Sequence, residues 1–290
     1  MNTLLVSDKA LSVINQYLHF RFNDAVASIP YYNNNRKVVR AGLRGLVGKG
    51  SPRDIFDEVE IAITKDKNTT IGSGITHAAD GGVPIERGAM KAGSYLPDAL
   101  TNEALKHFLV DHNIGIDCSG FVYYVIEAEL IARGKSTLDR YLHFPFSKGI
   151  LSKIRSKFRP VENTGVATLA HNSNSKHIEL IDIKPADIIT MTEGAQERDH
   201  VLFVHQVDYQ NFKPITIHYT HSIAWPTDGV YGTGVRQGTI DILDIKKPIA
   251  EQKWSEAGKI STGKDVHSQE NYTYTRALKA RTEIRRMLSL

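Results

Sequence analysis

Among the side chains of this sequence that could do chemistry, one thiol stands alone. Cys118 is the sole cysteine in 290 residues, and it lies directly ahead of an apolar helical pattern over 119–133. Unpaired N–H groups and the positive end of the helix dipole stabilise a thiolate at such a position. We therefore expect a lowered thiol pKa and a nucleophile, as cysteine catalysis requires. The alternative is a small buried apolar side chain.

A nucleophilic thiol needs a neighbouring base, and His200 is the best candidate. It immediately precedes the apolar run 201–204, so we expect it at the start of a strand, where its side chain can face a cleft. His205 follows along the same strand. Because successive side chains alternate between faces, we expect His205 on the opposite face, in a structural role or exposed to solvent.

The group that orients the base should come from the next strand, 215–222, which carries two histidines. His221 shares a face with apolar and aromatic residues, whereas His218 lies on the other, hydroxyl-rich face. Since the apolar face should pack toward the core, we prefer His221, with His218 as the alternative. Either could instead be a buried histidine with a purely structural role.

A helix and a sheet must hold these side chains in place. Short apolar runs separated by turns predict strands over 188–191, 201–207, 215–222 and 238–243. Together with the helix over 119–133, which Gly134 should end, they indicate an α+β fold with an antiparallel sheet. The last segment, Tyr274 to Leu290, has apolar residues at helical spacing and is predicted to be a basic amphipathic helix that docks on the domain.

The first quarter of the chain indicates a separate unit. Apolar residues at helical spacing between 11 and 18, and a helix start at Ser51-Pro52, predict a mostly helical accessory region over residues 1–75. The glycine-rich stretch from Ile71 to Tyr95 should contain the boundary. Residues 76–290 would then form the domain that holds the cysteine.

Four segments, in this order, resemble the NlpC family, papain-like cysteine peptidases of the bacterial cell wall. Residues 117–122, Asp-Cys-Ser-Gly-Phe-Val, are similar to the family's D-C-S-G-[FLW]-V signature around the nucleophile. The segment Pro185-Ala186-Asp187-Ile188-Ile189 is similar to its P-G-D-[LI]-[VI] motif, with alanine in place of the glycine. The other two resemblances are His200-Val201 to the strand of the catalytic histidine, and His221-Ser222, followed by Gly234-Val235-Arg236, to the third site.

The resemblance covers about residues 90–245 and implies a papain-like fold that hydrolyses amide bonds in peptidoglycan stem peptides. It implies that Cys118 attacks, His200 acts as base and His221 orients it. Asp117 and Ser119 would help to shape the substrate end of the site. Asp117 has a plain alternative role as a helix N-cap.

Two further residues are candidates for the substrate site. The family's P-Y-x-x-G-G segment shortly before the cysteine is absent here, and Tyr95 is its nearest substitute. Trp225 lies in a turn after His221, where it could line a substrate groove or simply pack against neighbours.

Composition limits the other classes of function. Hydrophobic residues make up 41% and charged residues 23%, which is typical of a globular protein, and no stretch is long enough to span a bilayer. Charged residues interrupt the apolar start of the chain, so we expect no signal peptide. One cysteine excludes an intramolecular disulfide, and the histidines lack the spacing of a metal site, so we expect no metal or cofactor.

The net charge of +4 suits anionic polymers but selects none of them, and we expect no nucleic-acid partner. Two functions besides the peptidase remain open. The same thiol chemistry would serve an amidase or an acyltransferase with another substrate. A chain with an inert thiol would instead be a non-catalytic module that binds the cell wall.

Overall fold

An antiparallel sheet forms the centre of the computed structural model, which describes residues 1–33, 48–69, 100–193, 198–257, 265–267 and 271–290. The strand order in this sheet is β10-β9-β8-β7-β6-β5-β11-β4, and β1 pairs with the second half of β6. The strands are β1 (Asn2–Leu5), β4 (Ser175–His177), β5 (Ile188–Thr192), β6 (His200–Gln210), β7 (Lys213–Ile223), β8 (Gly234–Asp241), β9 (Lys253–Ala257), β10 (Asp265–His267) and β11 (Arg281–Met287).

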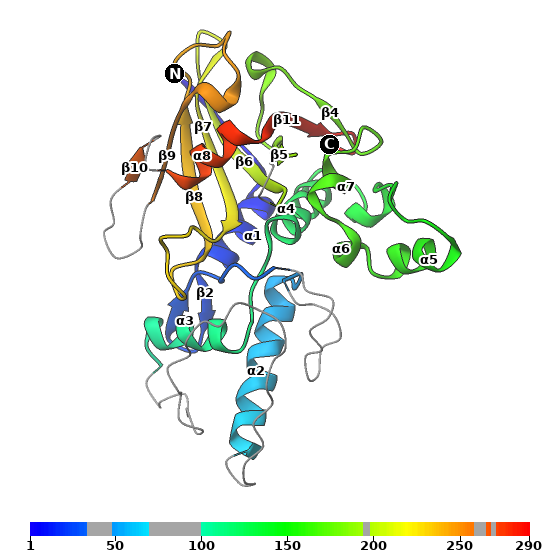
Figure 1. Ribbon diagram of the computed structural model, residues 1–290, viewed down its shortest axis with the longest axis vertical. Helices are drawn as coiled ribbons and strands as arrows, with labels where there is room; N and C mark the ends of the chain where they lie inside the picture. Colours follow the sequence, from blue (N-terminus) through cyan, green and yellow to red (C-terminus); the bar gives the residue numbers. More distant parts are fainter. Residues whose placement is uncertain (34–47, 70–99, 194–197, 258–264, 268–270) are drawn as a thin grey trace.

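Helices cover both faces of this sheet (Figure 1). On one face, α1 (Asp8–Leu18) and α4 (Cys118–Ala132) enclose a hydrophobic core with Val201 and Phe203 of β6. On the other face, α8 (Tyr272–Lys279) covers a second core that contains Leu202 and Val204. The strand alternates between two apolar surroundings because it is buried on both sides.

The remaining elements lie around this centre (Figure 1). They are the two-stranded sheet β2 (Phe20–Phe22) and β3 (Ala25–Ala27), and the helices α2 (Pro52–Thr69), α3 (Asn102–Asp111), α5 (Ile150–Phe158), α6 (Pro160–Asn163) and α7 (Val166–Ala170). The last three form an arm that projects from one side of the sheet. They occupy the segment between 134 and 178, which the sequence presents only as a polar connection.

The expected helix and antiparallel sheet are confirmed, as α+β. Helix α4 begins at Cys118 and ends before Gly134, whose φ of +73° is the left-handed conformation that ends many helices. All four predicted strands form, as β5 to β8. Their lengths differ because β6 and β7 extend beyond their apolar runs into the turn that joins them.

The start of the chain is more closely joined to the rest than a helical accessory region would be. β1 pairs with β6, with Leu5 opposite Gln206, and the buried Ile14 and Tyr17 of α1 belong to the core shared with α4. Local pattern could not show this, because the partner strand lies some two hundred residues further along the chain. The boundary expected between 71 and 95 lies outside the described residues.

The predicted C-terminal helix is wrong beyond Lys279. Helix α8 ends there, and the next residues form β11, which lies between β5 and β4. Leu278 and Leu288, which seemed to share an apolar helix face with Ile284, are half exposed. Strand alternation decides the structure here, since it buries Ile284 against β5.

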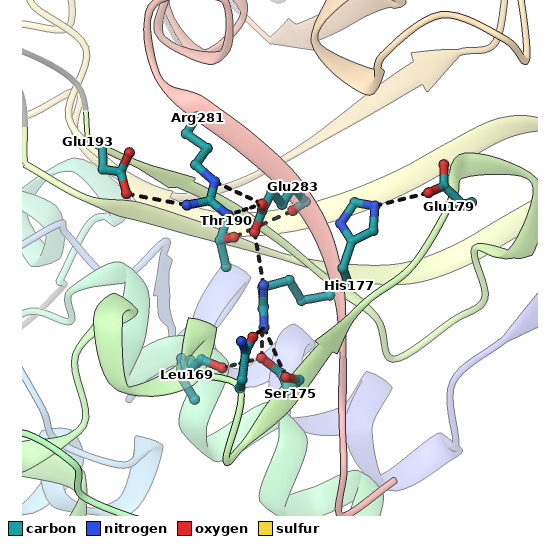
Figure 2. A network of polar contacts seen from close by, with 10 residues as sticks. Leu169, Ser175, His177, Glu179, Thr190, Glu193, Arg281 and Glu283 are labelled. Carbon is teal, nitrogen blue, oxygen red and sulfur yellow. Dashed lines mark hydrogen bonds and ion pairs between the residues drawn. The ribbon is translucent and has the colours of Figure 1, made fainter.

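Charged residues of β11 find partners that only the sheet supplies. Figure 2 shows Arg281 between Glu283 and Glu193, at 2.6 and 3.4 Å. Arg285 is buried, and its guanidinium donates to Ser175 Oγ at 2.8 Å and to Glu283 Oε2 at 2.9 Å. Ion pairs and hydrogen bonds of this kind let a strand with four charged residues lie inside a sheet. None of the helices in the described ranges could cross a bilayer.

Candidate active site

The thiol of Cys118 lies at the first residue of α4, where the local sequence fixes the start of the helix. Asp117 is the N-cap, and its Oδ1 accepts the N–H of Gly120 at 2.6 Å. The backbone N–H of Val201, at the start of β6, donates to the thiol. This bond brings the sulfur of α4 beside the residue that follows His200.

The expected lowering of the thiol pKa is wrong. Burial and the Asp117 carboxylate raise the pKa of Cys118 to about 11, against the opposing effects of Lys49, the Val201 bond and Arg276. The helix dipole is a modest effect, whereas loss of solvent around a thiolate is a large one. The thiol therefore carries its proton in the resting protein and needs a base to remove it.

His200 and His221 meet in the structure, and a third residue extends their contact. His200 Nε2 lies 2.8 Å from His221 Nδ1, and His221 Nε2 lies 3.1 Å from Glu256 Oε1 of β9. All three side chains are buried. His200 is a neutral base in the resting protein, because burial, Arg276 and His221 hold its pKa well below the ordinary value.

The carboxylate of Glu256 sets which ring nitrogens carry protons. Burial would raise the pKa of Glu256, but His221, Arg236 and the Tyr219 hydroxyl hold it below its ordinary value. An ionised carboxylate only accepts hydrogen bonds, so a neutral His221 donates from Nε2 and accepts at Nδ1. His200 must then donate from Nε2, and its Nδ1 keeps the lone pair. The hydrogen-bond network therefore assigns Nδ1 of His200 as the proton acceptor.

A glycine makes room for this carboxylate. Gly238 of β8 pairs with Tyr219 on one side and with Glu256 on the other. A Cβ at Gly238 would lie 2.3 Å from the Tyr219 hydroxyl oxygen, so a side chain is excluded there. The open space lets that hydroxyl donate to Glu256 Oε2 at 2.7 Å. The second carboxylate oxygen is thus also bonded.

A buried lysine lies under the start of α4. Lys49 is 1% exposed, and its Nζ donates to Asp117 Oδ1 at 2.9 Å, Ser119 Oγ at 2.6 Å and the Thr164 carbonyl oxygen at 2.8 Å. Its three protons therefore all have acceptors. The ammonium balances the charge of the capping carboxylate and ties α4 to the chain after α6. Close packing explains Gly120, because a Cβ there would lie 3.1 Å from the Lys49 side chain.

A polar pocket of about 350 Å³ opens beside the thiol. Tyr31 and Asn33 line it from the N-terminal region, residues 162–168 from the end of the α5–α7 arm, and Arg198 and Asp199 from the chain before β6. Tyr31 is held there because its neighbours Pro30 and Tyr32 bond the backbone of Ile116. Three regions far apart in sequence thus converge on Cys118.

The other predicted site residues have separate places. Asp117 and Ser119 line the pocket but are also bonded to each other and to Lys49, so the N-cap role of Asp117 is confirmed. Trp225 is absent from the described lining; it is 4% exposed and its indole N–H donates to Thr273 of α8, so it packs instead. Tyr95 lies outside the described residues.

The two alternative histidines lie away from His200. His218 Nε2 is 2.8 Å from Asp208 Oδ2, and His205 Nδ1 is 3.0 Å from the Thr220 hydroxyl. His205 is buried, so of the two expectations for it, solvent exposure is wrong. The contact with His200 is made by His221, on the face that alternation assigned to it.

Sequence reasoning missed Lys49, Glu256 and Tyr31. Lys49 was considered only as part of a phosphate-binding loop, which its surroundings did not match. Glu256 belongs to a short strand, Lys-Trp-Ser-Glu-Ala, whose alternation of apolar and polar residues was the available signal. Tyr31 follows a proline, so it supplies the Pro-Tyr pair that was sought near residue 95.

The comparisons with known proteins add no family to this geometry. No family model, no curated protein and no solved structure matches the chain. Within the described residues, no three histidine, cysteine or carboxylate side chains are grouped so that they could hold a metal ion. The chemistry must therefore be argued from the site itself.

Proposed function

We propose that this protein is a cysteine hydrolase that cleaves amide bonds of peptidoglycan stem peptides through an acyl-enzyme at Cys118. One observation carries the proposal: His200 offers Nδ1 beside the thiol while its Nε2 is held by His221, which Glu256 holds in turn. A base that is oriented by a buried acceptor is the arrangement that nucleophilic catalysis requires.

The reaction follows from the assigned proton positions. Cys118 Sγ attacks the amide carbonyl carbon while His200 Nδ1 takes the thiol proton. The imidazolium then gives this proton to the leaving amine as the C–N bond breaks, which leaves a thioester. Water attacks the thioester with His200 again as base, and the products are a carboxylic acid and the free thiol. The backbone N–H of Cys118 would help to stabilise the oxyanion.

Glu256 has a specific part in these steps. The positive charge that forms on His200 lies next to His221, and the buried carboxylate stabilises that charge through the second ring. In surroundings without water such stabilisation is stronger than in solution. Protonation of His200, which burial disfavours in the resting protein, thus becomes accessible in the transition state.

Two observations support the resemblance that supplies the substrate class. Ala186 stands where the family motif has glycine, and its φ of +75° is the conformation that favours glycine. The Pro30-Tyr31 pair lies beside the nucleophile, as a segment beginning with Pro-Tyr precedes the family's cysteine. The pocket also fits a charged peptide, since Arg198 and Asp199 line it together with amide and hydroxyl side chains.

Digestion of purified muropeptides tests the proposal. We expect wild type to release new amine and carboxyl termini, identified by mass spectrometry, and Cys118→Ala and His200→Ala to release none. His177→Ala, which removes a half-exposed histidine, is the matched control and should keep full activity. Absence of cleavage across several wall chemistries would refute the substrate class. Transfer of the acyl group to an added amine, without hydrolysis, would indicate an acyltransferase.

Labelling of the thiol separates an enzyme from a binding module. At neutral pH, iodoacetamide should label Cys118 in wild type and in His177→Ala, and more slowly in His200→Ala, because only His200 can take the thiol proton. The same slow labelling in all three proteins would show that the thiol has no base. The chain would then be a module that binds the wall without catalysis.

A further inference from the structure

Helix α5 carries apolar side chains on the side that faces solvent. Within 13 residues the exposed large apolar side chains are Phe146 (60%), Ile150 (78%), Leu151 (83%), Ile154 (47%) and Phe158 (82%). Single exposed apolar residues are common on protein surfaces, whereas a contiguous group marks a surface that binds something. The helix projects at the edge of the molecule, in the arm formed by α5, α6 and α7 (Figure 1).

The helix geometry makes these side chains one stripe. At about 100° per residue, Ile150, Leu151, Ile154 and Phe158 lie within an arc of about 100° of the helix surface. Ser156 lies on the opposite side and is 2% exposed, so that side faces the protein. A surface helix normally buries its apolar stripe and exposes its polar side. Here the polar side is buried, and the apolar stripe points outward.

Basic residues flank the stripe on both sides. Lys148, Lys153, Arg155 and Lys157 are exposed, with Arg155 on one flank and Lys153 and Lys157 on the other. Between Asp139 and Glu162 the sequence has no acidic residue. The surface therefore combines an apolar ridge with a positive border and no compensating negative charge within this segment.

We propose that α5 docks on an anionic phospholipid bilayer, with its apolar stripe in the headgroup and acyl boundary and its basic flanks against lipid phosphates. A short helix with aromatic and aliphatic residues on one side, bordered by Lys and Arg, is the form of an interfacial membrane helix. Each basic residue near a negative leaflet adds about 1 kcal/mol of binding. The apolar side chains stand on a convex ridge, which suits the fluid interface of a bilayer.

The arm also connects this surface to the candidate active site. Residues that follow α5, from Glu162 to Thr168, line the pocket beside Cys118, and Lys49 bonds the Thr164 carbonyl oxygen. Docking of α5 would therefore hold the pocket close to the membrane surface. The membrane inference rests on exposure and charge alone, so it stands or falls independently of the proposed hydrolase activity.

Vesicle sedimentation tests the docking surface. The full chain is mixed with phosphatidylcholine vesicles, with or without phosphatidylglycerol. We expect at least about tenfold tighter binding to the anionic vesicles, since two or more basic residues contribute. Leu151→Glu/Phe158→Glu should abolish binding. Phe212→Glu/Leu243→Glu is the matched control, because these residues are 97% and 70% exposed on other parts of the surface, and it should bind as wild type does.

A charge variant separates the two components of binding. Lys153→Gln/Lys157→Gln should lower affinity for anionic vesicles and weaken its dependence on salt, with an unchanged circular dichroism spectrum. Three results would overturn the proposal. They are equal or absent binding to both vesicle types, an equal loss in the Phe212→Glu/Leu243→Glu control, and a dimer in solution that Leu151→Glu/Phe158→Glu dissociates while vesicle binding is absent, which would make α5 a contact between copies of this chain.

Discussion

Glu256 Oε1 lies 3.1 Å from His221 Nε2, although the two residues belong to strands that do not pair with each other. The strand between them contributes Gly238, whose missing side chain leaves the space that the contact needs. The carboxylate thereby fixes the tautomer of His221 and, through it, the nitrogen with which His200 can act as base. A cysteine and two histidines become a chain of four oriented groups.

Glu256→Gln should lower kcat by about a hundredfold or more with little change in KM, because the neutral amide does not stabilise the imidazolium pair. Steady-state kinetics on the cleaved muropeptide measures this, and the pH profile should lose its plateau where His200 titrates. Asp208→Asn is the matched control, since Asp208 holds His218 in a similar contact away from His200. Equal losses in both variants would show that the effect is structural.

Lys49→Met should destabilise the fold by about 3–5 kcal/mol, because it leaves the buried Asp117 carboxylate without its counter-charge. The double variant Lys49→Met/Asp117→Asn should recover part of this loss, since the unpaired charge is then absent. Urea unfolding of the single and double variants measures both. If the double variant is less stable than Lys49→Met, the lysine acts through packing and not through the carboxylate.

Stability should fall between pH 6.5 and pH 4. Burial, with a smaller effect of His218, lowers the pKa of His205 to about 4, so in this window the unfolded chain binds a proton that the folded chain does not. The free energy of unfolding therefore decreases as the pH falls, by up to about 3 kcal/mol for this residue. Burial lowers the pKa of His200 too, which adds in the same direction.

His205→Gln should reduce this loss, since glutamine keeps a hydrogen-bonding group near Thr220 but does not titrate. Urea unfolding at pH 7 and pH 4.5 compares the variant with wild type and with His177→Gln, a half-exposed histidine. An unchanged pH dependence in His205→Gln would assign the acid sensitivity to other groups.

Ala186→Gly should leave stability unchanged or raise it by up to about 1 kcal/mol, because glycine adopts a positive φ without the strain of a Cβ. Ala186→Val should destabilise by more than about 2 kcal/mol, since a β-branched residue is strained there and the site is buried. Urea midpoints of the two variants decide. A similar loss in both would show that the methyl packing of Ala186 outweighs its backbone strain.

Local signals in the sequence were enough for much of the fold. Asp117 caps α4 because a carboxylate before the helix can accept the N–H of Gly120, and this depends only on neighbours along the chain. Alternation placed His221 on the face that carries Tyr219, where it contacts His200. Helix starts and strand faces follow from such short-range patterns, so these predictions agree with the structure.

The tertiary structure decided what depends on partners distant in sequence. Residues 281–287 form a strand because β5 and β4 accept them on either side, which helical spacing could not show. Lys49 and Glu256 lie 69 residues before and 138 residues after Cys118, and only folding brings them to its site. The direction of the thiol pKa depends on burial, a property of the packed molecule. The sequence alone thus determined the nucleophile and its base, and folding determined their charges and their support.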